Sequence, residues 1–178
     1  MSRKWILGGV AAVAALVGGW YVVSPMWALK TMQTAVEARD ADALSAQIDF
    51  PALREDLKAE MSAAMMAEAQ RKGGQDAAGA MLGMAFADKM IDGMVSPAGV
   101  KMLMANADRA PQPGKVTLGP TPNISDFNSD KFDIERNGFS EFTLRRKDDP
   151  KNGGIIFRRD GLGWKLAGID LPPEGLGK

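Results

Sequence analysis

The sequence contains no cysteine and no histidine. Without cysteine, the chain can form no disulfide bond, zinc–sulfur site or iron–sulfur cluster, and it has no thiolate nucleophile. Without histidine, it lacks the commonest metal ligand and the side chain best suited to acid–base catalysis near neutral pH. These absences lead us to expect no catalytic residue, no cofactor and no metal site, and hence a protein that is not an enzyme.

Neither sign of charge is in excess, because 22 basic residues balance 22 acidic ones. No overall field therefore attracts nucleic acid, and we expect no nucleic-acid partner. A phosphate-cradling loop of glycine, lysine and serine is missing, and Ser140 has no histidine to activate it as a nucleophile. A buried carboxylate acting as a base, with Asp49 or Asp170 as candidates, is the enzymatic alternative that remains open.

One stretch begins like a calcium-binding loop. Residues 126–130 place oxygen ligands at the first, third and fifth positions of such a loop. A working loop then needs glycine at its sixth position and glutamate at its twelfth, where this chain has Lys131 and Asn137. Because a lysine ammonium repels the ion, we interpret this stretch as a polar turn.

Residues 5–23 form an apolar stretch without a single charge. As a helix this stretch would rise roughly 28 Å, close to the hydrocarbon thickness of a bilayer. Trp5 lies at one end, and Trp20 and Tyr21 lie at the other, as is typical of an interfacial aromatic belt. We therefore expect one transmembrane helix, with Trp5, Trp20 and Tyr21 as its anchoring residues.

The charges around this stretch predict its orientation. Arg3 and Lys4 precede it, and no basic residue follows until Lys30, which places the N-terminus in the cytoplasm and the domain outside. The alternative is a cleaved signal peptide with its apolar region at 6–16 and a small-residue cleavage site at 17–19. In either case we expect the domain to be exported.

Proline and aspartate mark the helix boundaries in the first half of the chain. Ser24 followed by Pro25 predicts a helix start, and Asp40 can cap a short second helix. Two longer helices are expected over residues 51–72 and 77–94. The segment 77–94 is apolar almost all round, so we expect it to be largely buried.

All 12 methionines lie at or before position 104. Flexible thioethers can fill the core of an alanine-rich domain, which is the default interpretation, or line an adaptable apolar groove for a lipid or a partner helix. The candidate groove residues come from the two longer helices: Met61, Met65, Met81, Met84, Phe86 and Met90.

The pattern changes after position 110. Four prolines exclude a helix over 110–128, which we interpret as a connection with one edge strand at 116–118. Beyond it, apolar and polar residues alternate, and turns at Asn137-Gly138, 148–154 and Asp160-Gly161 separate the strands. Helices followed by strands indicate an α+β domain, with several helices packed on one face of a curved four- to five-stranded antiparallel sheet. Cystatins and nuclear transport factor 2 share that shape, by analogy of architecture.

We expect one exported domain with an N-terminal anchor. Its expected parts are a cytoplasmic tip and transmembrane anchor at 1–23, a helical part at 24–109, the proline-rich connection at 110–128, an antiparallel meander at 129–173 and a tail at 174–178.

The strands also carry a candidate surface patch, formed by Arg145, Arg158, Ile156 and Ile169. Its basic residues could bind lipid headgroups or peptidoglycan. Acidic residues on the same strands offer a simpler interpretation, in which cross-strand charge pairs form on a solvated face without any ligand, and we favour that interpretation.

Three parts of the chain resemble the bacterial domain-of-unknown-function family 2939. They comprise residues 24–25 with 35–40 and 49–54, residues 96–100, and the closing run 164–172. The resemblance implies an exported or membrane-anchored bacterial protein without an assigned activity. It transfers no catalytic residue to this chain.

We therefore expect a non-catalytic binding or interaction module of the bacterial cell envelope. It would be held in the inner membrane by one N-terminal helix, with its domain in the periplasm, or secreted if that helix is cleaved. An envelope protein or a lipid is the expected partner. The alternatives are a carrier of a small lipophilic ligand in a methionine-lined cavity and, less favoured, a carboxylate-dependent enzyme. The sequence does not predict the oligomeric state.

Overall fold

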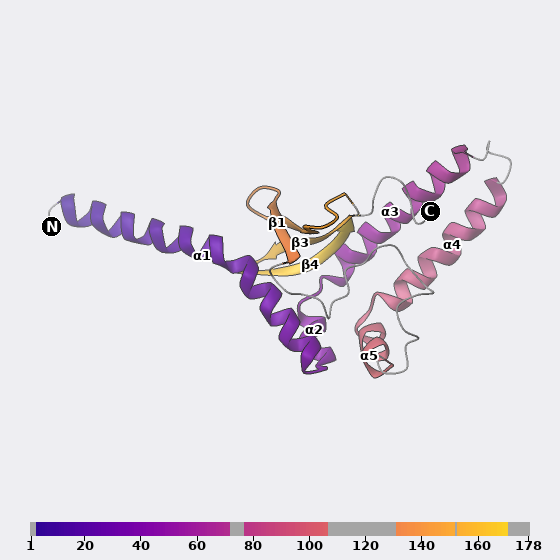
Figure 1. Ribbon diagram of the computed structural model, residues 1–178, viewed down its shortest axis with the longest axis horizontal. Coiled ribbons are helices and arrows are strands. Elements are labelled where there is room, and N and C mark those ends of the chain that lie inside the picture. Colours follow the sequence, from indigo (N-terminus) through magenta and orange to yellow (C-terminus); the bar gives the residue numbers. More distant parts are fainter. Residues whose placement is uncertain (1–2, 72–76, 107–130, 152, 171–178) are drawn as a thin grey trace.

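The computed structural model describes residues 3–71, 77–106, 131–151 and 153–170 (Figure 1). The described elements run in the order α1 (Arg3–Glu37), α2 (Ala41–Ala46), α3 (Phe50–Arg71), α4 (Ala77–Met94), α5 (Pro97–Ala105), β1 (Phe132–Arg136), β2 (Glu141–Arg146), β3 (Gly154–Asp160) and β4 (Gly163–Asp170). Helices followed by an antiparallel sheet confirm the α+β class. The calcium-like stretch, the proline-rich connection with its edge strand, and the tail lie outside the described residues.

Helix α1 is one continuous helix of 35 residues with Pro25 in its interior. The prediction that a helix begins at Ser24 and Pro25 is therefore wrong. Figure 1 shows α1 projecting away from the rest of the molecule and bending where it meets the sheet. A bend is what an interior proline produces, because proline donates no hydrogen bond to the carbonyl four residues earlier.

Within the residues whose side chains the structure describes, no helix is both long enough and apolar enough to cross a membrane. The structure thus does not support the transmembrane helix that the sequence predicts for residues 5–23, and that helix stays a prediction.

The four strands form one antiparallel meander in the order β1-β2-β3-β4. The predicted turns at Asn137-Gly138 and Asp160-Gly161 are confirmed. Gly138 and Gly161 adopt φ values of 90° and 59°, a conformation that favours glycine. The sheet brings two turns, 137–140 and 161–162, to the same end, since Glu141 beside the first pairs with Arg158 near the second.

The hydrophobic core lies on one face of the sheet, under the second half of α1, α2 and α5. At its centre, Phe142 and Phe157 stack with ring centroids 4.8 Å apart, and Trp164 meets Phe142 edge-on at 4.9 Å. The predicted cap of α2 is also confirmed, because the Asp40 carboxylate accepts hydrogen bonds from the backbone N–H groups of Asp42 and Ala43.

The free edge of β4 is covered by the chain around α3. Leu166 donates its N–H to the Gln47 carbonyl at 2.9 Å and accepts from the Asp49 N–H at 2.8 Å. Further along, the N–H of Ile169 donates to the Asp56 carboxylate at 2.8 Å. These bonds satisfy backbone groups that would otherwise invite another strand to pair.

Helix α4 is not the buried helix that its composition predicts. Phe86, Met90 and Met94 are 69%, 47% and 44% exposed. The reason is that α4 packs mainly against α3 and α5, and it is α3 that joins this hairpin to the sheet by lying against β4. The α3–α4 hairpin thus extends beyond the sheet, opposite the α1 arm in Figure 1. When the sequence of a helix is apolar on all sides, it does not indicate which of those sides will pack against other elements.

Candidate interaction surfaces

Tyr21 is the point at which the helical arm meets the sheet. Its hydroxyl donates to the Gly138 carbonyl in the β1–β2 turn at 2.8 Å. Its ring lies 4.8 Å from the guanidinium carbon of Arg136 and 5.2 Å from that of Arg159. Arg159 also lies over Trp164 at 4.5 Å. We call these five residues the collar, because cation–π contacts and the hydroxyl bond hold the helix from several sides.

The collar also supplies hydrogen bonds to the backbone carbonyls at the bend. Pro25 cannot donate to the carbonyl of Tyr21, and that oxygen instead accepts from the Ser24 hydroxyl at 3.2 Å and from Arg136 at 3.4 Å. Arg136 also donates to the carbonyl of Val22 at 2.9 Å. Trp164 donates its indole N–H to the buried Ser24 hydroxyl at 2.9 Å. The bend is therefore fixed to the sheet and is not a free hinge.

Large apolar side chains that are exposed to solvent surround the collar. Phe139 is 84% exposed with its ring 5.7 Å from that of Tyr21, and Leu162 in the neighbouring turn is 75% exposed. Trp20 and Trp27 pair with ring centroids 6.4 Å apart, and both are exposed. Of the predicted anchor residues, Trp20 and Tyr21 thus lie at this end of the sheet, and the side chain of Trp5 is outside the description.

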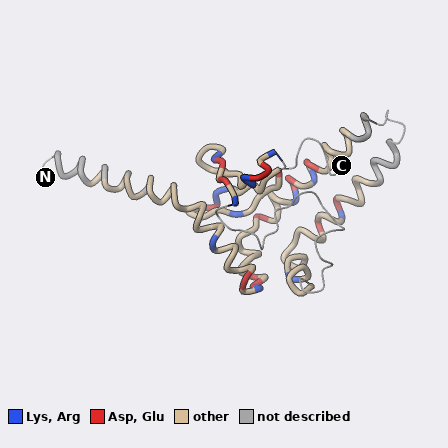
Figure 2. The backbone as a smooth tube through the Cα atoms, in the orientation of Figure 1, with Lys and Arg blue, Asp and Glu red and all other residues tan. Residues whose placement is uncertain are grey.

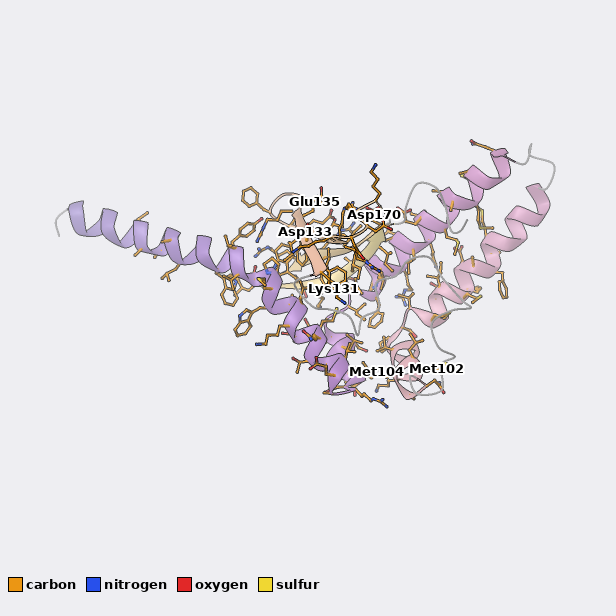
Figure 3. The ribbon with its side chains drawn as sticks, in the orientation of Figure 1. Met102, Met104, Lys131, Asp133, Glu135 and Asp170 are labelled. Atoms are coloured by element: carbon orange, nitrogen blue, oxygen red, sulfur yellow. The ribbon has the colours of Figure 1, made fainter. Side chains whose placement is uncertain are left out.

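The face of the sheet opposite the hydrophobic core carries a network of ion pairs. Arg145 on β2 binds Glu135 on β1 at 2.8 Å and Asp170 on β4 at 2.5 Å, so one guanidinium links both edge strands. Its two partners, Glu135 and Asp170, are labelled in Figure 3. Its hydrogen bonds to Glu135 and Asp170 raise the pKa of Arg145 above its ordinary value. Between these two partners, the Arg145 side chain passes close to Gly154 on β3. A Cβ added to Gly154 would lie 3.3 Å from Cγ of Arg145.

The basic residues of the candidate patch are occupied by ion pairs of this kind. Arg158 binds Glu141 at 3.1 Å, so both of the arginines that the sequence singles out are paired with carboxylates. Figure 2 shows basic and acidic residues intermixed over the sheet. This geometry favours the interpretation as cross-strand charge pairs. Ile156 is half-buried on the same face.

Ile169 lies on the other face, because a bulge between Ile156 and Phe157 shifts the register and places Ile169 opposite the buried Ile155. Ala167, two positions before Ile169 on the same strand, is also buried, with an exposure of 0%.

Two carboxylates that the sequence patterns did not single out lie between α3 and β4. Burial raises the pKa of Asp56, and the bond from Ile169 and the charge of Arg158 oppose that rise. Burial also raises the pKa of Glu60, together with the charges of Asp56 and Asp170. A glycine inside a strand signals close approach, and a Cβ on Gly168 would lie 2.6 Å from the Asp56 carboxylate.

Metal binding finds no support in the part of the chain that the structure describes, because no three metal-ligating residues gather there. The two carboxylates that the sequence offers as bases have structural partners. Asp49 accepts from the Ala52 N–H at the start of α3, and Asp170 binds Arg145.

The methionine candidates are only partly brought together. Met61, Met65 and Met84 are half-buried along the α3–α4 hairpin. A Cβ on Gly83 would lie 2.9 Å from the terminal methyl of Met65, so this glycine allows the helices to approach closely. Phe86 and Met90 are exposed, and the side chain of Met81 lies outside the description.

The model of one protein family, described as "Protein of unknown function (DUF2939)", matches residues 14–103. The match contains the first two stretches on which the resemblance was based, and the closing run at 164–172 lies beyond it. No curated protein and no solved structure matches the chain.

Proposed function

We propose, from the premise that the chain belongs to the DUF2939 family, that it is a non-catalytic binding or interaction module of the bacterial cell envelope. In this proposal residues 5–23 tether it in the inner membrane, with the N-terminus in the cytoplasm and the α+β domain in the periplasm. The partner is an envelope protein or a lipid.

The observation that carries the proposal is the apolar arm formed by the first part of α1. Its described side chains are apolar and solvent-exposed on several sides of the helix, with Val10, Val13, Leu16, Val22 and Val23 each more than half exposed. Keeping such side chains in water is unfavourable by about 25 cal/mol for each Å² of apolar surface. A lipid environment removes that cost, and the uncharged sequence 5–23 suits it.

The α3–α4 hairpin and α5 offer the surface for a partner. Met66, Phe86 and Met102 are each at least 60% exposed, and Met90, Met94 and Leu103 extend the apolar surface. Exposed apolar patches of this kind mark interaction sites in soluble domains. The two arginines of the candidate patch, Arg145 and Arg158, are already engaged with carboxylates of the same chain. This favours the helical hairpin over the sheet as the place where a partner binds.

The tether is tested with a reporter enzyme fused after Lys178 and assayed for activity in the periplasm and the cytosol. We expect periplasmic activity and recovery of the chain with the membrane fraction. A Leu16→Arg variant should weaken membrane retention, because charge is costly at the centre of a bilayer. A reporter that is active only in the cytosol would refute the proposed location.

The partner surface is tested by crosslinking in intact cells. Phe86→Glu should abolish a crosslinked product that the wild-type chain forms through α4, whereas the matched variant Asp88→Lys, also exposed on α4, should retain it. Equal crosslinking of both variants would exclude this face of α4 as the binding surface.

A lipophilic-ligand carrier is the second candidate, favoured by the half-buried Met61, Met65 and Met84 between α3 and α4. Mass spectrometry of the gently purified chain should then detect a co-purifying lipid that a Met65→Glu variant does not retain. Identical spectra for the two forms would argue against this candidate.

A further inference from the structure

We infer that the end of the sheet bearing Phe139 and Leu162 rests on the outer surface of the phospholipid bilayer. The inference rests on the proposed tether and extends it: the domain would not hang freely from its helix but would lie against the lipid headgroups. In this contact, two turn tips with exposed apolar side chains would enter the interfacial layer, and arginines would lie close behind them.

The position of the first tip follows from Tyr21. In the proposed tether, Tyr21 lies at the outer end of the apolar stretch, where aromatic rings meet the headgroups. The Tyr21 hydroxyl donates to the carbonyl of Gly138, and its ring lies 5.7 Å from that of Phe139. The β1–β2 turn is therefore at the same depth as the end of the anchor.

The second tip is held beside the first. The N–H of Arg159 donates to the Ser140 carbonyl at 2.8 Å, and the Arg159 side chain donates to the carbonyl of Phe139 at 3.2 Å. Leu162 follows in the turn after Asp160 and is 75% exposed. Two separate turns thus present an exposed apolar side chain at the same end of the sheet.

The bend at Pro25 does not release the domain from this orientation. Arg136 donates to the carbonyls of Tyr21 and Val22 on one side, and Trp164 donates to Ser24 on the other. Because all three bonds come from the sheet, the direction of the anchor determines the orientation of the sheet.

The composition of this end suits a lipid surface better than a protein partner. The exposed Trp20 and Trp27 present amphipathic indoles of the kind that concentrate at membrane interfaces. Arg136 and Arg159 place positive charge behind the tips, which complements lipid phosphate. The nearby carboxylate of Asp160 is paired with Lys165 at 2.6 Å.

The absence of cysteine allows a clean test on the full chain. Single variants Phe139→Cys, Leu162→Cys and Asp149→Cys are labelled with an environment-sensitive fluorophore and reconstituted into vesicles of phosphatidylethanolamine and phosphatidylglycerol that contain a nitroxide-headgroup lipid. Asp149 is the matched control, because it is an exposed residue in the β2–β3 connection, at the far end of the sheet. We expect several-fold stronger quenching and a blue-shifted emission at positions 139 and 162.

The outcomes separate this inference from the tether. If the labelled chain floats with the vesicles but all three probes are quenched equally, the contact is refuted and the tether stands. If the chain does not float, the tether fails and the contact fails with it. Because Phe139 and Leu162 are exposed, replacing them leaves the core intact, and circular dichroism of each variant checks this.

Discussion

Arg136 donates a hydrogen bond to the carbonyl oxygen of Tyr21 from 115 positions further along the chain, at the place where Pro25 removes the normal helical donor. The bond is long, at 3.4 Å, and is accompanied by the 2.9 Å bond to Val22. Helix α1 thus continues through Pro25, from the arm into the domain. The contact between these residues links the proposed tether to the orientation of the sheet.

Replacing Arg136 by methionine should lower the free energy of unfolding of the full chain in mild detergent by about 1 kcal/mol, since a hydrogen bond is typically worth that much. In a Pro25→Ala background the helix regains its own donor, so the same replacement should cost less. A double-mutant cycle measured by urea denaturation checks the coupling. Additive losses would mean that Arg136 does not compensate for the proline.

Trp164 and Ser24 form a buried pair whose two partners are unequal in bulk. Ser24→Ala leaves the indole N–H without an acceptor in the core and should cost about 1–3 kcal/mol. Trp164→Phe removes the donor but also shrinks a side chain that packs edge-on against Phe142. The double variant should lose less than the sum of the two, because it leaves no orphaned polar group. Thermal unfolding monitored by circular dichroism measures all three.

The sequence predicted those parts of the fold whose causes are local. The cap at Asp40 acts on N–H groups within three positions, and the turn at Gly138 needs only the residues around it. These features depend on short-range chemistry that a pattern of residues expresses directly. The class of the fold follows from the same patterns.

The rest of the fold depends on partners that are distant in the chain. Nothing near Pro25 indicates that Arg136 will replace the missing helical bond, and nothing in residues 77–94 indicates that one side of α4 remains uncovered. The bulge beside Ile156 reverses the face of Ile169 without a local turn signal. The carboxylate of Asp56 was missed because its environment is created by β4.

Gly154 should be intolerant of any side chain. A Cβ at this position would lie 2.6 Å from Cγ2 of Thr143, which is itself buried, and 3.3 Å from Cγ of Arg145. Gly154→Ala should therefore destabilise the domain by about 1–3 kcal/mol through overpacking. Gly93→Ala in α4 is the matched control, since nothing lies within 4 Å of its added methyl.

The Gly93→Ala control should be neutral or gain up to about 1 kcal/mol, because alanine favours a helix more than glycine does. Denaturation curves of both variants compare them directly. If Gly154→Ala unfolds at the same denaturant concentration as the wild type, β2 and β3 are not packed as closely as the structure places them.

Asp56 should make the domain less stable as the pH rises. Its pKa is raised in the folded state, mainly by burial, from an ordinary value of 3.8. Above pH 3.8 the folded chain therefore holds more of this proton than the unfolded chain does. By linkage, stability then falls as the pH rises from 3.8 through the folded pKa, and it levels off above that pKa. Asp56→Asn can still accept from the Ile169 N–H, but it cannot ionise.

The variant Asp56→Asn should therefore flatten this part of the stability profile and be at least as stable as the wild type at neutral pH. Asp92 supplies a control of opposite sign, because its hydrogen bond with Lys58 lowers its pKa. Its stabilising contribution is present above pH 3.8 and is lost as the pH falls through the lowered pKa, so Asp92→Asn should weaken the domain at neutral pH. Urea denaturation across this pH range measures both slopes. Equal slopes for the wild type and Asp56→Asn would mean that the Asp56 carboxyl ionises as readily in the folded chain as in the unfolded one.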